Sequence, residues 1–148
     1  VLFRSMVLPS FVSSALKGED LIVHGDGTQR RCFAHVEDIV DALVRLSSHP
    51  GAVGQIFNLG SQEEITIHDL ARRVIQRTGS SSRITFLPYE QAYPDGFEDM
   101  QRRVPDISKV NALIGYRPQI DLNGIIDSVV GYYQQQMAGA AQTPNSPQ

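Results

Sequence analysis

The chain has 148 residues, of which 41% are hydrophobic and 20% are charged, as is typical of one soluble globular domain with its own core. Its formal net charge of -3 argues against binding to nucleic acid or to an anionic membrane surface, since both favour a basic face. A single cysteine, Cys32, excludes an internal disulfide and a cysteine-based zinc site, and fits a reducing compartment, so we expect a cytoplasmic protein.

The two ends of the chain differ in composition from the part between them. Residues 1–5 precede Met6 without a recognisable purpose, and we interpret them as a truncated or foreign leader. Residues 138–148 are small, polar and proline-containing, which predicts a disordered tail because they bury too little apolar area to offset their ordering entropy. The domain is therefore expected to span residues 6–137. No apolar run reaches the ~18 residues that a membrane helix needs, so no membrane segment is expected.

The first part of the domain predicts a helix and two strands. Apolar residues recur at helical spacing over residues 8–16, and Gly18 is a suitable stop. Residues 21–23 and 31–36 predict strands on either side of a glycine-rich turn. On the second strand, alternation places the small apolar side chains, with Val36 among them, on the face that lies under a packed layer.

The middle of the domain predicts a helix, a strand and a second helix. The first helix starts near Asp38, and its buried side is expected to consist of Ile39, Val40, Leu43 and Leu46. Residues 55–60 predict a buried strand. Thr66, with Asp69 three residues later, resembles a capping box at the start of a helix that Gly79 ends.

The last part predicts one more strand and two helices. Residues 83–88 predict the strand, and residues 88–104 a long loop of the kind that is often functional. Asp106 is expected to cap a short helix ending at Gly115, and Asp121 to cap the final helix. The predicted order is αββαβαβαα, so the expected fold class is mixed α/β.

Two pairs of adjacent arginines remain once helices and caps are assigned. Arg30 and Arg31 leave the glycine-rich turn, and Arg102 and Arg103 end the long loop. A guanidinium group is a planar fork of donors that matches phosphate oxygens two at a time, so arginines converging from two loops suit a diphosphate. Exposed ion pairs contribute only about 0–1 kcal/mol, and the spacing alone leaves open that these arginines merely pair with surface carboxylates such as Asp26.

Three segments resemble one protein family in the same order. They are MVLPSFVSSALKGEDLIVHGDGTQRRCFAHVEDIVDAL, IFNLGSQEEITIHDLA and RRVPDISKVNALIGYRP, and the likeness covers residues 6–134. Together they are similar to the C-terminal part of the extended short-chain dehydrogenase/reductases that act on nucleotide sugars, namely NAD-dependent epimerases, 4,6-dehydratases and UDP-glucuronate decarboxylases. The resemblance implies a small C-terminal substrate-binding subdomain plus strands that complete a Rossmann-type sheet whose N-terminal part is absent from this sequence.

The resemblance also implies which residues bind a nucleotide diphosphate sugar, with a UDP-sugar expected. The arginines of the family that match Arg31 and Arg103 contact the diphosphate, and Arg102 adds supporting charge. His24 stands where relatives commonly have Tyr or Phe, which leaves the choice of base open. The region beside the base is implied to comprise Val7, His24, Gly25 and Asp26.

The residues that would bind NAD and transfer hydride are missing from this sequence. No glycine-rich turn joins a strand to a helix as a dinucleotide site requires, and no tyrosine is followed four residues later by the lysine of the family's catalytic pair. We therefore expect no catalytic, cofactor-binding or metal-binding residue here, with NAD bound by the absent N-terminal half. Cys32 and His35 are expected to be structural, since nothing near Cys32 would stabilise a thiolate.

The leading hypothesis is that the chain is the substrate-binding portion of an NAD-dependent nucleotide-sugar epimerase, dehydratase or decarboxylase. Alone it would be inactive, and the intact enzyme would be a homodimer. Residues 31–35 and 55–59 are expected to dock against the N-terminal half and to leave an apolar patch exposed. The alternative is a stand-alone, non-catalytic nucleotide-sugar-binding or interaction module, and a third possibility is a structural domain with surface arginines.

Overall fold

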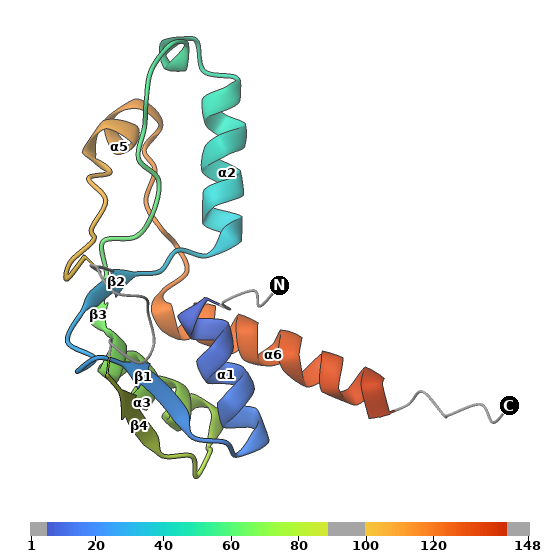
Figure 1. Ribbon diagram of the computed structural model, residues 1–148. Coiled ribbons are helices and arrows are strands. Elements are labelled where there is room, and N and C mark those ends of the chain that lie inside the picture. Colours follow the sequence, from blue (N-terminus) through green and yellow to red (C-terminus); the bar gives the residue numbers. More distant parts are fainter. Residues whose placement is uncertain (1–5, 89–99, 142–148) are drawn as a thin grey trace, which may run out of the picture.

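The computed structural model describes residues 6–88 and 100–141, which form two lobes (Figure 1). The lower lobe holds α1 (Val7–Lys17), β1 (Leu21–His24), α3 (Ile67–Thr78), β4 (Ile84–Leu87) and α6 (Leu122–Ala141). The upper lobe holds α2 (Val36–Ser47), the short 3-10 helix η1 (Pro50–Ala52) and α5 (Ser108–Ile114). Between the lobes lie β2 (Arg30–Cys32) and β3 (Glu64–Thr66). None of the helices in these described residues combines the length and hydropathy of a membrane span.

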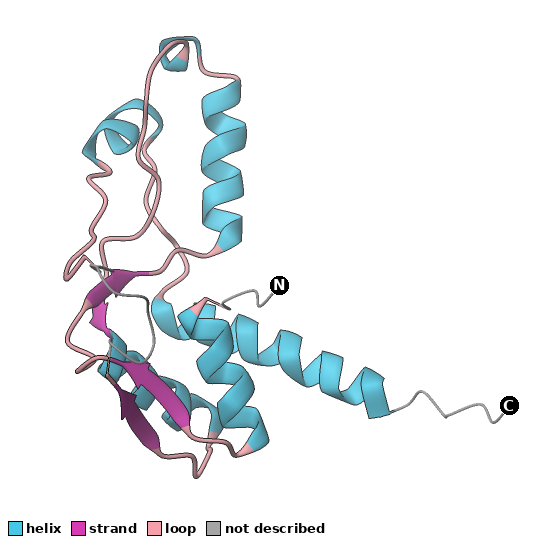
Figure 2. Ribbon diagram, viewed as in Figure 1, coloured by secondary structure: helices cyan, strands magenta, loops and turns pink. Residues whose placement is uncertain are grey.

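The strands of the described residues are short and pair in two separate sheets (Figure 2). β1 and β4 run parallel, with Val23 opposite Phe86, whereas β2 and β3 run antiparallel. The backbone N–H of Arg30 also donates to the carbonyl of Gln101 at 2.7 Å. The segment that leads to α5 therefore follows the edge of β2, which brings the second arginine pair close to the first.

The lower lobe has a continuous apolar core. Leu21 and Val23 of β1 are fully buried, and so are Leu70 and Val74 of α3. The two other helices of the lobe complete this core with Leu8, Phe11, Val12, Ala15, Leu122, Ile125 and Ile126. The helices α1 and α3 and the first half of α6 thus bury their apolar side chains against other elements of the same chain.

Local capping explains where α3 begins and ends. The Oγ1 atom of Thr66 accepts the backbone N–H of Asp69 at 3.0 Å and lies 2.8 Å from the Asp69 carboxylate. Gly79 ends the helix in the left-handed conformation, with φ of 63°, which glycine adopts without steric cost. The predicted capping box and stop are both confirmed.

The upper lobe has a smaller core. Its buried side chains are Ala42 of α2 together with Ile107, Val110, Ile114 and Tyr116. On α2, Val36, Val40, Leu43 and Val44 are 51–67% exposed. The predicted buried side of this helix was therefore wrong at Val40 and Leu43, because α5 covers the side that carries Asp38 and Ala42 instead.

Two predicted strands differ in the structure. Residues 55–60 form no strand, and Ile56 is 85% exposed, since no described strand pairs with this segment. The third strand is β3, a few residues later. β2 ends at Cys32, and Val36 already belongs to α2, because Nδ1 of His35 accepts the N–H of Glu37 at 3.3 Å and caps that helix.

The helix α6 continues to Ala141, past the predicted domain boundary at residue 137. Its second half extends away from the rest of the lower lobe (Figure 1). The predicted tail from residue 138 is thus helical at its start, and the remaining tail and residues 1–5 lie outside the described part of the chain.

A buried carboxylate connects the two lobes. Asp38, in the first turn of α2, is 9% exposed and accepts the backbone N–H groups of Gln119 and Ile120, each at 3.1 Å. These residues lie directly before α6. Asp38 therefore fixes the N-terminus of α2 to the chain segment that returns to the lower lobe.

Candidate functional site

Arg31 and Arg103 line one cavity of about 530 Å³ at the junction of the lobes. The two residues are far apart in sequence, and the antiparallel pairing of β2 with β3 places Arg31 at this point. The other side chains and backbone segments around the cavity are Cys32, Ala34, Ile39, Asn58, Leu59, Gly60, Ser61, Val104, Pro105 and Asp106. The structure therefore brings together the two arginines that sequence reasoning singled out for a diphosphate.

Two stretches of irregular chain line this cavity and contact each other. Nδ2 of Asn58 donates to the carbonyl of Asp106, and Nε2 of Gln62 donates to the carbonyl of Pro105, both at 3.3 Å. A Cβ atom on Gly60 would lie only 2.9 Å from Cγ of Pro105, so the close approach requires glycine. Sequence reasoning missed Asn58 as a lining residue, although its position in the segment IFNLGS marked the right region.

The backbone holds the guanidinium group of Arg31 in place. Its Nη1 atom donates to the carbonyls of Arg30 and Met100, each at 2.7 Å. These carbonyls belong to β2 and to the segment that follows its edge. Arg31 is therefore oriented by the same pairing that forms the cavity, and preorganised donors bind an anion with less loss of side-chain entropy.

The protonation states of Asp106 and Cys32 affect the charge of the cavity. The N–H of Ser108 donates to the carboxylate of Asp106 at 2.9 Å and lowers the pKa of Asp106, so this carboxylate stays ionised near neutral pH. Burial, followed by the nearby charge of Glu64, raises the pKa of the Cys32 thiol. Cys32 thus remains protonated at neutral pH, as a structural rather than a nucleophilic residue would.

Arg102 points to a different partner. It forms a double hydrogen bond with the carboxylate of Glu64 on β3, at 2.6 and 2.8 Å, and this bond lowers the pKa of Glu64. Arg102 is not among the residues that line the cavity. The donors of Arg102 therefore bind a carboxylate in this structure, and its place in the substrate site stays a prediction.

The turn expected to lie beside the base has its own hollow. Gly25 and Asp26 line a shallow space of about 480 Å³ together with Phe86 and Pro88, at the ends of β1 and β4. The carboxylate of Asp26 accepts the N–H of Thr28 at 2.9 Å and its hydroxyl at 2.7 Å, which lowers the pKa of Asp26. Asp26 thus shapes this turn.

His24 directly precedes this turn, and Val7 packs against the core of the lower lobe. The backbone carbonyl of His24 accepts a hydrogen bond from Gln29 at 3.1 Å, which closes the turn on its inner side. Val7 begins α1 and packs against the lower core. Neither residue lines the cavity of Arg31 and Arg103 or the hollow of Gly25 and Asp26.

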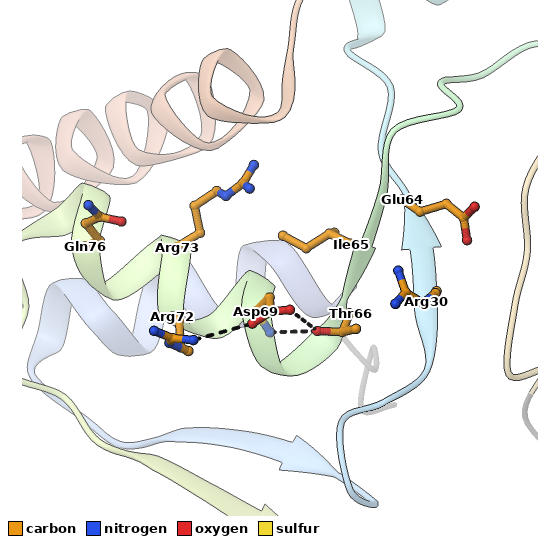
Figure 3. Close-up of a pocket in the computed structure, with 8 residues that line it drawn as sticks. All are labelled: Arg30, Glu64, Ile65, Thr66, Asp69, Arg72, Arg73 and Gln76. Atoms are coloured by element: carbon orange, nitrogen blue, oxygen red, sulfur yellow. Dashed lines mark hydrogen bonds and ion pairs between the residues drawn. The ribbon is translucent and has the colours of Figure 1, made fainter.

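Another cavity, of about 600 Å³, is lined by three arginines, of which Arg72 and Arg73 form ion pairs (Figure 3). Figure 3 shows Asp69 turned toward Thr66 and Arg72, with an Arg72–Asp69 separation of 3.7 Å. Arg73 points the other way, toward α6, and pairs with Glu63 at 3.4 Å. This surface therefore mixes three arginines with the carboxylates of Glu64 and Asp69.

Comparison with known proteins identifies the family of the chain. Residues 2–60 match the model of the NAD dependent epimerase/dehydratase family. The mixed α/β fold with a small parallel sheet is one that the chain shares with solved epimerases. The chain belongs to the NAD dependent epimerase/dehydratase family.

Individual relatives extend the match to most of the chain. It is 36% identical over 129 residues to UDP-N-acetyl-alpha-D-glucosaminuronate decarboxylase of Bacillus cytotoxicus, covering 87% of this chain and 40% of that protein. It is also 36% identical to UDP-glucuronic acid decarboxylase 1 of Danio rerio, covering 88% of this chain and 29% of the relative. UDP-glucuronic acid 4-epimerase from Bacillus cereus, solved with UDP-glucuronic acid and NAD, superposes with a TM-score of 0.77 at 25% identity, over 89% of this chain and 40% of that one. The chain therefore spans well under half the length of these relatives.

The described residues do not fit the dinucleotide part of such an enzyme. A pyrophosphate site for NAD needs a glycine-rich turn between a strand and the N-terminus of a helix. The left-handed glycines Gly25 and Gly27 instead join two strands, and Gly18, Gly79 and Gly115 follow the ends of helices. Within residues 6–88 and 100–141, no group of three or more metal-ligating side chains is present either.

Proposed function

We propose that this chain is the part of an NAD-dependent nucleotide-sugar enzyme that binds the nucleotide diphosphate sugar. The observation that carries the proposal is the cavity shared by Arg31 and Arg103. Two guanidinium groups offset the charge of a diphosphate and match its oxygens with paired donors. Among the described residues that line the cavity, these two arginines lie beside one carboxylate, that of Asp106.

The proposed role is positioning rather than chemistry. The diphosphate would lie between Arg31 and Arg103, the base beside the turn at Gly25 and Asp26, and the sugar toward a cofactor held by an N-terminal half. The relatives named above act on UDP-sugars or are solved with one, which supports a UDP-sugar as the ligand. Decarboxylases and an epimerase both appear among them, so the proposal covers this group of reactions.

The exposed apolar side of α2 supports an absent partner half. Val40, Leu43 and Val44 form one helical stripe, and large exposed apolar stripes usually mark interfaces. A free-standing binding module would normally bury such a stripe, so we favour the incomplete-enzyme hypothesis. In size-exclusion chromatography the chain alone should self-associate, and Val40→Lys should reduce this; a monodisperse wild-type monomer would contradict the docking proposal.

Calorimetric titration tests the ligand. UDP, dTDP and GDP are titrated into the wild-type chain and into the Arg31→Ala and Arg103→Ala variants. Losing one charge-assisted contact should cost roughly 1.5–3 kcal/mol, which weakens binding by about 10- to 150-fold. Arg83→Ala is the matched control, because Arg83 pairs with Asp20 on the surface and lines no part of the cavity.

The outcomes separate the proposal from its alternatives. If Arg31→Ala and Arg83→Ala bind the nucleotides equally well, the diphosphate does not bind in this cavity. A folded wild-type chain that binds none of the three nucleotides would favour a structural domain with surface arginines. Circular dichroism of each variant shows whether it is folded.

A further inference from the structure

Gln29 is a buried amide between the two parts of the proposed ligand site. Only 6% of its surface is exposed, and it lies two residues before Arg31. Its Nε2 atom donates to the carbonyl of His24 at 3.1 Å, and its backbone carbonyl accepts the N–H of Ile67 at 3.1 Å. In the part of the chain that the structure describes, no donor lies within hydrogen-bonding distance of its Oε1 atom.

This unsatisfied acceptor makes Gln29 a poor choice for stability alone. Removing an amide oxygen from water without a donor in exchange costs free energy of folding, and buried polar atoms without partners are rare. A methionine has nearly the same length and shape and carries no such acceptor. An apolar side chain would avoid this cost, but it would leave the carbonyl of His24 without the donor that Gln29 provides.

The hydrogen bond that Gln29 does make acts on the geometry of the site. His24 is the last residue of β1, and its carbonyl is fixed by the Gln29 side chain across the turn. The outer part of the turn is fixed separately, since the carbonyl of Gly27 accepts the N–H of His68 at 3.0 Å. Gly27 is confined there, because a Cβ atom would lie 2.8 Å from Val23 and 3.0 Å from His68.

Along the chain, the proposed base region at Gly25 and Asp26 precedes Gln29, and Arg31 follows it. Gln29 therefore connects the two regions. We propose that Gln29 is a positioning residue that sets the distance between the base-binding turn and the diphosphate-binding Arg31, at a cost in stability. This inference rests on the proposed function. A ligand that spans both regions needs the correct separation, whereas a ligand that occupies one region does not.

The substitution Gln29→Met in the 148-residue chain tests the inference with two ligands. UDP spans both regions, and inorganic pyrophosphate occupies only the region of Arg31. Calorimetry should show about tenfold weaker binding of UDP, comparable to the loss of one hydrogen bond, and binding of pyrophosphate unchanged within about twofold. The melting temperature should stay close to that of the wild type, because the removal of the unsatisfied acceptor offsets the loss of the hydrogen bond to His24.

A matched control and two contrary results complete the test. Gln119→Met removes an amide that donates to the carbonyl of Arg117 at 2.8 Å away from the site, and it should change the binding of neither ligand. Gln29→Met with a lower melting temperature and unchanged UDP binding would show a purely structural amide and overturn the inference. In that case Arg31→Ala would still weaken both ligands and leave the proposed function standing, whereas a wild-type chain that binds neither ligand would overturn both.

Discussion

The apolar side chains of the helices are mostly buried in the lower lobe and partly exposed in the upper lobe. In the lower lobe, Leu70 and Val74 of α3 are fully buried by elements of the same chain, whereas in the upper lobe Leu43 and Val44 of α2 are more than half exposed. Both helices are amphipathic in sequence. An apolar stripe therefore predicts burial without specifying which chain covers it, and part of the apolar surface of the upper lobe is uncovered here.

The largest effect should come from a matched pair of leucines, one in each lobe. Leu70→Ala leaves a cavity in a fully buried site and should lower the free energy of unfolding by about 2–5 kcal/mol. Leu43→Ala, at a site that is 53% exposed, should change it by less than about 0.5 kcal/mol. Urea unfolding followed by circular dichroism measures both, and similar losses would show that α2 is covered in solution.

The buried carboxylate that joins the lobes should give an intermediate effect. Asp38→Ala leaves the N–H groups of Gln119 and Ile120 without their acceptor, so the free energy of unfolding should fall by roughly 1–3 kcal/mol. Hydrogen exchange should quicken at these two amides first. Asp41→Ala is the control, since Asp41 makes only an exposed pair within α2; equal effects of both variants would show that the lobes are not joined through Asp38.

The smallest effect should come from the ion pair between Glu64 and Arg102. This pair lowers the pKa of Glu64 below its ordinary value of 4.5 in the folded state. The stabilisation is therefore complete above pH 4.5 and is lost as the pH falls through the lowered pKa. The stability difference between wild type and Glu64→Gln should shrink on acidification in urea titrations at several pH values, and a difference that grows would refute the pairing.

Features with local causes could be predicted from the sequence. The capping box of Thr66 and Asp69, and the stops at Gly79 and Gly115, depend on residues three or four positions apart and are found as expected. The predicted order of elements also agrees with the order over residues 6–88 and 100–141, although the third strand lies at β3. Short-range hydrogen bonding and backbone conformation are enough to fix these features.

Features that depend on distant partners could not be predicted from the sequence. The apolar run at residues 55–60 resembled a strand, but a strand exists only where another one pairs with it. The ion pair between Arg102 and Glu64 likewise depends on the pairing of β2 and β3. The meeting of Arg31 and Arg103 was expected only through family resemblance, since no local pattern connects residues so far apart.

The walls of the Arg31 cavity come from β2, from α2 and from the two stretches that meet at Gly60 and Pro105. The cavity therefore exists only while these four segments keep their native arrangement. Any small molecule that occupies it will therefore shift the thermal midpoint upward by mass action, in proportion to the logarithm of its concentration. Dye-based melting curves across a panel of nucleotides would consequently rank candidate ligands without a catalytic assay.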